Sequence, residues 1–182
     1  MKKNIVFIIM SLASIFCLNA QSIIKADSVE IIKDYKNLYR YQNFYLSGQP
    51  TFEELQWLRS KNVTVIINLR TDDENIKFSE SAYNEQTVAQ DLGFEYHSLS
   101  IQGEKDFTPE KLEVFLNLIE DDKTVLVHCR SAGRVTYFFM AYLIKVKGYS
   151  INEAVKIGKS LKYSFPLETL LGTEIIMEEL KQ

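Results

Sequence analysis

Short apolar runs alternate with segments of helical periodicity through the middle of this chain, and the alternation restricts the folds open to it. The run at residues 63–69 is continuous and rich in β-branched residues, as in strands buried on both faces of a parallel sheet. Further strands are predicted at residues 94–101 and 124–128, each with a helical segment after it. This order predicts an α/β domain with a mainly parallel central sheet of about four to five strands, flanked by helices.

Turn and capping signals place the other elements. Serine or threonine followed three positions later by glutamate forms a capping box, which begins a helix at Thr51 and another at Ser150. The polar stretch at residues 70–75 is interpreted as a loop, ahead of a helix near residues 80–92. The remaining expected elements are an aromatic-rich hairpin at 38–41 and 44–47, a short helix near 29–35, a helix beginning at Thr108 and Pro109, and an amphipathic helix at 167–180.

Residues 1–20 have the pattern of a secretory signal peptide. Lys2 and Lys3 precede an apolar stretch, and the small residue Ala20 ends it. Cleavage there would leave residues 21–182 as a single domain, in an exported protein (periplasmic or secreted) with no stable membrane insertion. Removing the two lysines takes the formal net charge from −3 to −5. Nucleic acid is therefore not an expected partner, because a general nucleic-acid binder carries a basic surface.

Cys129 would be the only cysteine of the processed chain. It lies in the stretch His128-Cys129-Arg130-Ser131-Ala132-Gly133-Arg134, between the strand at 124–128 and an apolar run at 135–143 that is long enough for a helix. Ligand sites of α/β sheets lie at the carboxyl ends of strands, and free amides at a helix start attract anions and favour a thiolate. Arg134 adds a guanidinium fork for an oxyanion. The loop therefore predicts a thiolate nucleophile beside a tetrahedral anion.

Four segments resemble the cysteine-based protein tyrosine phosphatase superfamily, above all its small bacterial members associated with β-lactamase-type hydrolases. These segments are residues 45–50, 65–70, 93–96 and 128–134. The resemblance implies a dual-specificity-phosphatase-like fold and hydrolysis of phosphate monoesters, on a protein or a small molecule, through a phosphocysteine on Cys129. It also implies a phosphate-binding set, which consists of Arg134 and the loop residues Arg130, Ser131, Ala132 and Gly133.

A phosphatase of this kind needs a carboxylic acid to protonate the leaving oxygen. Asp106 is the chosen acid, with Glu104 second and Asp72 third. Arg70 ends a strand at the same sheet edge, where it could contact phosphate or pair with Glu74. All these side chains are expected to share one cleft with the cysteine loop. No cofactor or metal is expected, because the two histidines and the cysteine lack the spacing of metal ligands.

The cysteine loop also departs from the superfamily pattern. Four residues separate Cys129 from Arg134, where the superfamily usually has five, and Ala132 occupies a position that is usually glycine in the resembling subgroup. Either Ala132 takes a strained positive φ or Gly133 makes the bend instead. Two other functions remain open at this point. One is a sulfurtransferase resembling rhodaneses, which suits the shorter spacing; the other is a phosphate- or phosphoprotein-binding module without turnover.

Overall fold

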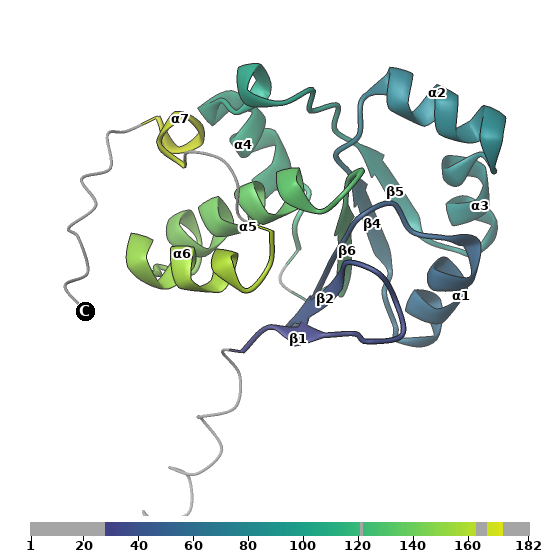
Figure 1. Ribbon diagram of the computed structural model, residues 1–182, viewed down its shortest axis with the longest axis horizontal. Coiled ribbons are helices and arrows are strands. Elements are labelled where there is room, and N and C mark those ends of the chain that lie inside the picture. Colours follow the sequence, from purple (N-terminus) through teal and green to yellow (C-terminus); the bar gives the residue numbers. More distant parts are fainter. Residues whose placement is uncertain (1–27, 121, 163–166, 173–182) are drawn as a thin grey trace, which may run out of the picture.

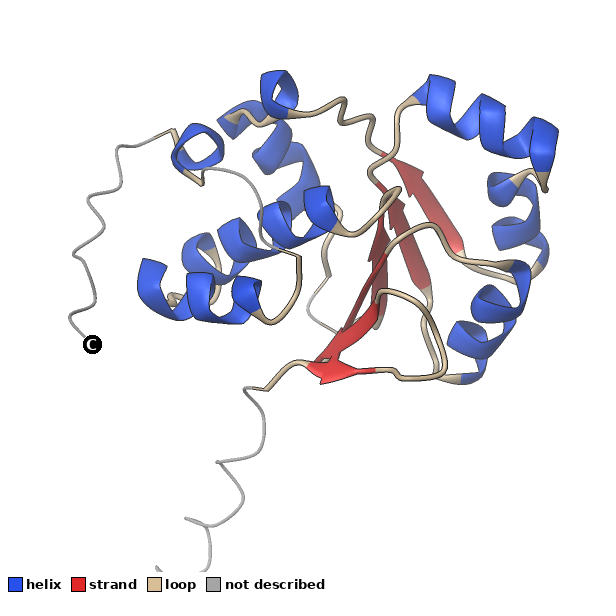
Figure 2. Cartoon of the chain, viewed as in Figure 1, coloured by secondary structure: helices blue, strands red, loops and turns tan. Residues whose placement is uncertain are grey.

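The computed structural model describes residues 28–120, 122–162 and 167–172. They form three layers, with a central sheet between two groups of helices (Figure 1; Figure 2). The expected α/β fold with a mainly parallel sheet is therefore confirmed. The predicted signal peptide at residues 1–20 lies outside the described residues, as does most of the helix expected at 167–180. Within the described ranges, no helix is both long and apolar enough to cross a membrane.

The sheet has six strands in the order β1-β2-β3-β6-β4-β5. Strands β3, β6, β4 and β5 are parallel, whereas β1, β2 and β3 pair antiparallel. Strand β1 is a two-residue edge strand in the stretch where a short helix was expected, so that expectation was wrong: Glu30 and Ile31 pair with Arg40 and Tyr39 instead. The strand bounds are β1 Glu30–Ile31, β2 Leu38–Tyr41, β3 Phe44–Ser47, β4 Val65–Asn68, β5 Glu95–Ser98 and β6 Val125–His128.

Helices cover both faces of the sheet. Helices α1, α2 and α3 lie on one side, and α4, α5, α6 and α7 lie on the other (Figure 1). The capping boxes at Thr51 and Ser150 begin α1 and α6 as predicted. The bounds are α1 Phe52–Ser60, α2 Asp72–Ser81, α3 Glu85–Asp91, a 3-10 turn η1 Glu104–Asp106, α4 Pro109–Asn117, α5 Gly133–Lys145, α6 Ile151–Lys159 and α7 Glu168–Leu171.

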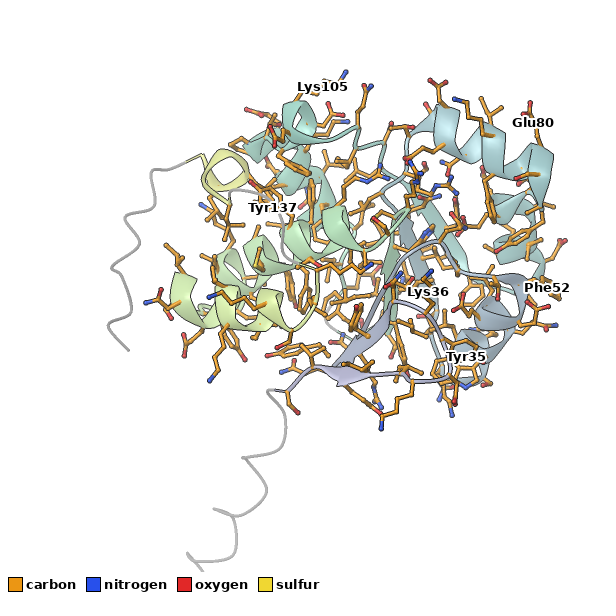
Figure 3. All side chains as sticks on the ribbon, in the orientation of Figure 1. Tyr35, Lys36, Phe52, Glu80, Lys105 and Tyr137 are labelled. Carbon is orange, nitrogen blue, oxygen red and sulfur yellow. The ribbon has the colours of Figure 1, made fainter. Side chains whose placement is uncertain are left out.

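Alternate residues of the central strands build two separate cores. Val65 and Val127 belong to the cluster formed with α4, α5 and α6, while Ile66 and Leu126 belong to the cluster formed with α1 and α3. This division follows from the period of two along a strand. Helix α5 is buried along most of its length. Figure 3 shows its residue Tyr137 in the interior, while Glu80 and Lys105 point outward.

The segment between β4 and β5 differs from its prediction. A loop at 70–75 and one helix near 80–92 were expected, but α2 already begins at Asp72 and a break at residues 82–84 separates it from α3. A capping box begins α2, in which Thr71 and Glu74 each bind the other's backbone. Polar residues in a first helical turn resemble a loop in composition, and that similarity produced the error.

Candidate active site

Strand β6 and helix α5 hold the cysteine loop between them. Strand β6 ends at His128, and α5 begins at Gly133, so Cys129 follows the carboxyl end of a central parallel strand. The first helical hydrogen bond runs from Thr136 N to Ala132 O, and the amides of Gly133 and Arg134 precede it. Amides at that position have no partner within the helix and can bind an anion.

The bend of the loop falls on Ala132. Its φ is +70°, in the left-handed region, while Gly133 is the first residue of α5. The structure therefore answers the question that the sequence left open: alanine, and not the following glycine, makes the turn. The Cβ atom of a non-glycine residue costs about 1–2 kcal/mol in this conformation. The hydroxyl of Thr136 donates to Ala132 O over 2.9 Å and so holds the bend from the helix side.

Arg134 is braced against the neighbouring loops. Its Nη1 donates to Leu69 O at 3.1 Å and to Ile101 O at 2.6 Å, and Nη1 and Nη2 bind the two carboxylate oxygens of Glu74 at 2.8 and 2.9 Å. These bonds leave Nε, and one hydrogen of Nη2, without an oxygen acceptor among the described residues. Burial alone would lower the pKa of Arg134, but the hydrogen bond to Glu74 and the nearby Cys129 and Glu74 charges raise it. The guanidinium is thus fixed, and one of its edges remains available to an anion.

Glu74 is a functional residue whose role the sequence did not reveal. The sequence allows a pairing with Arg70, but Arg70 reaches only its backbone oxygen, whereas its carboxylate binds Arg134 and also caps α2 at Thr71. Burial acts to raise the pKa of Glu74, yet the hydrogen bonds from Arg134 and Thr71 and the charges of Arg134 and Arg70 lower it overall. The signal was present in the sequence: Thr71 and Glu74 have the same spacing as the capping boxes recognised elsewhere.

A cavity of about 400 Å³ lies over the loop. Cys129 itself is only 1 % exposed, so the cavity reaches the loop through its neighbours. Asp73 and Lys77, which were not predicted, also line it. The complete lining is Thr71, Asp73, Glu74 and Lys77 from the start of α2, Gln102 and Gly103 from the segment after β5, and Arg130, Ser131 and Arg134.

The three candidate acids do not line this cavity. Asp106 and Asp72 line a smaller, adjoining cavity of about 230 Å³, which shares Thr71, Asp73 and Gln102 with the first. The carboxylate of Asp106 accepts a 2.6 Å hydrogen bond from the amide of Gln102. Glu104 is exposed on η1 and lines neither cavity. The single shared cleft that was expected is thus two adjoining cavities.

Arg70 lies elsewhere than expected. It is 6 % exposed and does not line the cavity over the loop. Its Nη2 donates to the backbone oxygen of Glu74 over 2.7 Å, and its Nη1 donates to Gln49. Burial is the main cause of a lowered pKa for this guanidinium, opposed by the charges of Glu74 and Glu85. Its position gives it a bracing role in this structure, and direct contact with phosphate stays a prediction.

The chemistry that the arrangement offers is anion binding next to a sulfur atom. A positive charge, helical amides and a cysteine meet at the end of β6, with a carboxylate-lined rim around them. Among the described residues, no group of three or more histidine, cysteine, aspartate or glutamate side chains could hold a metal ion. The loop after β6 and the start of α5 provide a nucleophile and an oxyanion site.

Comparison with known proteins identifies the family. A family model described as a DSP-PTPase phosphatase fused to NAD+ kinase matches residues 19–162. No curated protein matches the sequence. Among solved structures, a DUF442 phosphatase from Shewanella putrefaciens is 21% identical with a TM-score of 0.58, and the match covers 77% of this chain and 91% of that one.

Two further structures share the fold. The P. aeruginosa protein TpbA, solved in complex with pTyr, is 16% identical with a TM-score of 0.54, over 81% of this chain and 96% of TpbA. The kinase-associated phosphatase KAP, with its catalytic-site cysteine replaced by serine, is 17% identical with a TM-score of 0.54, over 65% of this chain and 75% of KAP. At these identities the likeness shows the fold, and the family model adds the membership. Because that model matches most of the sequence, the chain belongs to this DSP-PTPase family of cysteine-dependent phosphatases.

Proposed function

We propose that this protein hydrolyses phosphate monoesters through a phosphocysteine intermediate on Cys129. The sulfur attacks phosphorus, the ester oxygen leaves with a proton from a carboxylic acid, and water then releases inorganic phosphate. Arg134 and the amides from Arg130 to Gly133 bind the phosphoryl oxygens. The substrate is a phosphorylated protein or small molecule, and the aryl phosphate bound by the fold relative TpbA guides the choice of assay compound.

One observation carries the proposal. Arg134 is fixed by Glu74, Leu69 O and Ile101 O at the start of a long buried helix, and its guanidinium interacts with Cys129. A guanidinium held in advance stabilises the developing charge without reorganising during the reaction. A rhodanese-like sulfurtransferase, the first alternative, is disfavoured by the family match. A binding module without turnover is an outcome of the assay below.

The assay measures hydrolysis of an aryl phosphate by residues 21–182 without added metal. Hydrolysis is expected in the unmodified protein, and Cys129→Ser should abolish it while leaving the affinity for inorganic phosphate within about threefold, because Arg134 and the loop amides provide the binding. Glu110→Gln serves as the matched control, since Glu110 is exposed on α4. Phosphate binding without turnover in the unmodified protein would assign a binding module, and activity in Cys129→Ser would rule out the phosphocysteine.

Asp106 is the acid that we propose, with Glu104 and Asp72 behind it. Its carboxylate lies in the adjoining cavity and accepts from Gln102, a residue that both cavities share. Asp73 is a further candidate for the acid, because it lines both cavities. An acid that protonates the leaving group matters most when that group is a poor one. Asp106→Asn should therefore slow hydrolysis of an alkyl phosphate more than hydrolysis of a nitrophenyl phosphate. If only Asp73→Asn shows this difference, Asp73 and not Asp106 is the acid.

We also propose that the protein is exported. The support is the basic start, apolar stretch and small residue of positions 1–20. In a bacterial host, the protein recovered outside the cytoplasm is expected to begin at Gln21, as read by N-terminal sequencing. A chain that keeps Met1 and stays with the cytoplasmic fraction would contradict export.

A further inference from the structure

Glu85 and His128 form a buried pair next to the nucleophile. Glu85 Oε1 lies 2.7 Å from His128 Nε2, and the two side chains are 5% and 0% exposed. The contact has the length of an ion pair, although it lacks the alignment of a good hydrogen bond, and His128 Nδ1 has no partner among the described residues. Gln49 Nε2 holds the other carboxylate oxygen of Glu85 at 2.8 Å. The ring that immediately precedes Cys129 is therefore fixed by one polar contact, with Glu85.

The contacts continue from Gln49 to the other end of the cysteine loop. Arg70 donates from Nη1 to Gln49 Oε1 and from Nη2 to the backbone oxygen of Glu74. The carboxylate of Glu74 in turn binds Arg134 through two hydrogen bonds. A continuous polar chain thus joins the residue before Cys129 to the arginine that follows the loop. In order along this chain, its members are His128, Glu85, Gln49, Arg70, Glu74 and Arg134.

We propose that Glu85 is a positioning residue for the phosphatase reaction, which fixes the ring of His128 and thereby holds the sulfur of Cys129 in line with the bound phosphate. The inference rests on the proposed function, because it assigns a role in a reaction at Cys129. Glu85 touches neither substrate nor sulfur. It acts through the backbone between His128 and Cys129, where a displacement of about 1 Å can slow a reaction by up to about a hundredfold.

The charges around Glu85 support a carboxylate that stays ionised. Burial acts to raise the pKa of Glu85, but the close contact with the charge of His128, the hydrogen bond from Gln49 and the charge of Arg70 lower it overall. Tyr83, in the break before α3, and Tyr96, on β5, interact with its charge, and their pKa values are raised, mainly by burial and next by the Glu85 charge. Both phenols therefore remain neutral beside it.

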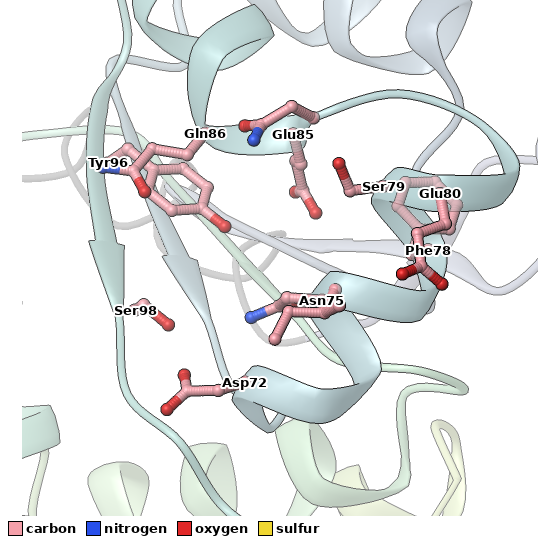
Figure 4. Close-up of a pocket in the computed structure, with 11 residues that line it drawn as sticks. Asp72, Asn75, Phe78, Ser79, Glu80, Glu85, Gln86, Tyr96 and Ser98 are labelled. Carbon is pink, nitrogen blue, oxygen red and sulfur yellow. The ribbon is translucent and has the colours of Figure 1, made fainter.

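Glu85 is also reachable from solvent on one side. It lines a cavity of about 380 Å³ between α2, α3 and β5, which is distinct from the cavity over the loop. Figure 4 shows its carboxylate pointing into this space, together with Asn75 and the Tyr96 hydroxyl. Glu80 lines the same cavity from α2 and is exposed. Glu80 is therefore a matched control, a carboxylate in the same cavity without a contact to His128.

The first experiment compares Glu85→Gln with Glu80→Gln in the purified protein. Glu85→Gln should lower kcat for nitrophenyl phosphate by about tenfold or more, while KM changes less than about threefold, because Arg134 and the loop amides still bind the phosphate. Alkylation of Cys129 by iodoacetamide should slow in parallel. Glu80→Gln should change neither rate. A Glu85→Gln variant with unchanged kcat, or with a loss confined to KM, would overturn the proposal.

A double-mutant comparison tests the route through His128. If Glu85 acts only by fixing this ring, His128→Asn with Glu85→Gln should be no slower than His128→Asn alone, whereas independent effects would multiply and would overturn the proposal. Alkylation needs no turnover, so it reports on Glu85 even if Cys129→Ser were to retain hydrolysis and refute the phosphocysteine.

A rescue experiment covers the case in which Glu85→Gln folds poorly. Glu85→Ala opens the buried position to the 380 Å³ cavity, and formate can then supply a carboxylate there. Formate should restore kcat and the alkylation rate of Glu85→Ala without changing the unmodified protein. If circular dichroism shows Glu85→Ala to be folded and formate restores neither rate, Glu85 has no positioning role.

Discussion

The pairing of Glu74 with Arg134 leads to a stability prediction with a defined pH dependence. Glu74→Gln keeps the size of the side chain and an oxygen that can cap α2, but it removes the charge that binds Arg134. The Glu74 and Arg134 side chains are 24% and 12% exposed. The pair is therefore intermediate between a surface ion pair, which is worth about 0–1 kcal/mol, and a buried ion pair, whose disruption costs about 3–5 kcal/mol. We therefore expect a loss of about 2 kcal/mol at pH 7, in line with charge-assisted hydrogen bonds.

The pH dependence follows from the direction of the Glu74 pKa shift. Its pKa in the folded protein is lower than the ordinary value, so the carboxylate contributes its full stability above the unfolded pKa of about 4.3. That contribution disappears as the pH falls through the folded pKa. The difference in unfolding free energy between the unmodified protein and Glu74→Gln should accordingly be largest at pH 7 and shrink as the pH is lowered below about 4.

Urea unfolding followed by circular dichroism at a series of pH values measures this difference. Asp73→Asn is the matched control, because Asp73 is exposed on the same helical turn and its substitution should cost less than about 0.5 kcal/mol. Thermal melts should show a shift of roughly 4–8 °C for Glu74→Gln at pH 7. A difference that is the same at pH 7 and at low pH, or that is below about 0.5 kcal/mol throughout, refutes the reasoning.

Three further predictions concern the loop and its supporting helices. Ala132→Gly should change the unfolding free energy by less than about 1 kcal/mol, because relief of left-handed strain offsets the lost methyl burial. Ala132→Val should lower the unfolding free energy by more than about 2 kcal/mol. Equal melting temperatures for the two variants would contradict this. Gly158→Ala would bring a Cβ within 2.2 Å of Met140 Sδ, so a loss of about 1–3 kcal/mol is expected in urea, and Met140→Val in the same chain should recover much of it. Arg134→Lys should lower kcat/KM by about a hundredfold or more while the protein stays folded, because a lysine cannot replace a two-point contact; a tenfold smaller effect would mean that the loop amides alone hold the phosphate.

Local sequence signals predicted the fold well where they act over a few residues. The hairpin of β2 and β3 and the starts of α1, α4 and α6 follow from turn and capping patterns, since these depend on neighbours in the chain. The start of α2 carries the same signal at Thr71 and Glu74, but its polar first turn was interpreted as a loop.

The supporting side chains of the site could not be predicted in this way. Cys129 and Arg134 are evident because they share one short loop, whereas Glu85 reaches His128 across 43 positions of sequence, and only the packing of α3 against the sheet brings them together. The same holds for Arg70, which ends a strand beside the site but turns its guanidinium toward Gln49. Which of several carboxylates faces a cavity depends on how the helices pack against the sheet, and the hydrophobic periodicity of the sequence does not determine that packing.

The burial of helix α5 determines how the loop moves. Nine consecutive residues from Val135 to Leu143 are shielded from solvent, so backbone amides along this helix can exchange with deuterated water only when the whole domain opens. The loop is attached to the first turn of that helix and therefore does not detach from it by local fraying of the kind seen at chain ends. Phosphatase activity and the folded structure should then be lost at the same denaturant concentration. The phosphate-binding loop does not open locally before the protein unfolds.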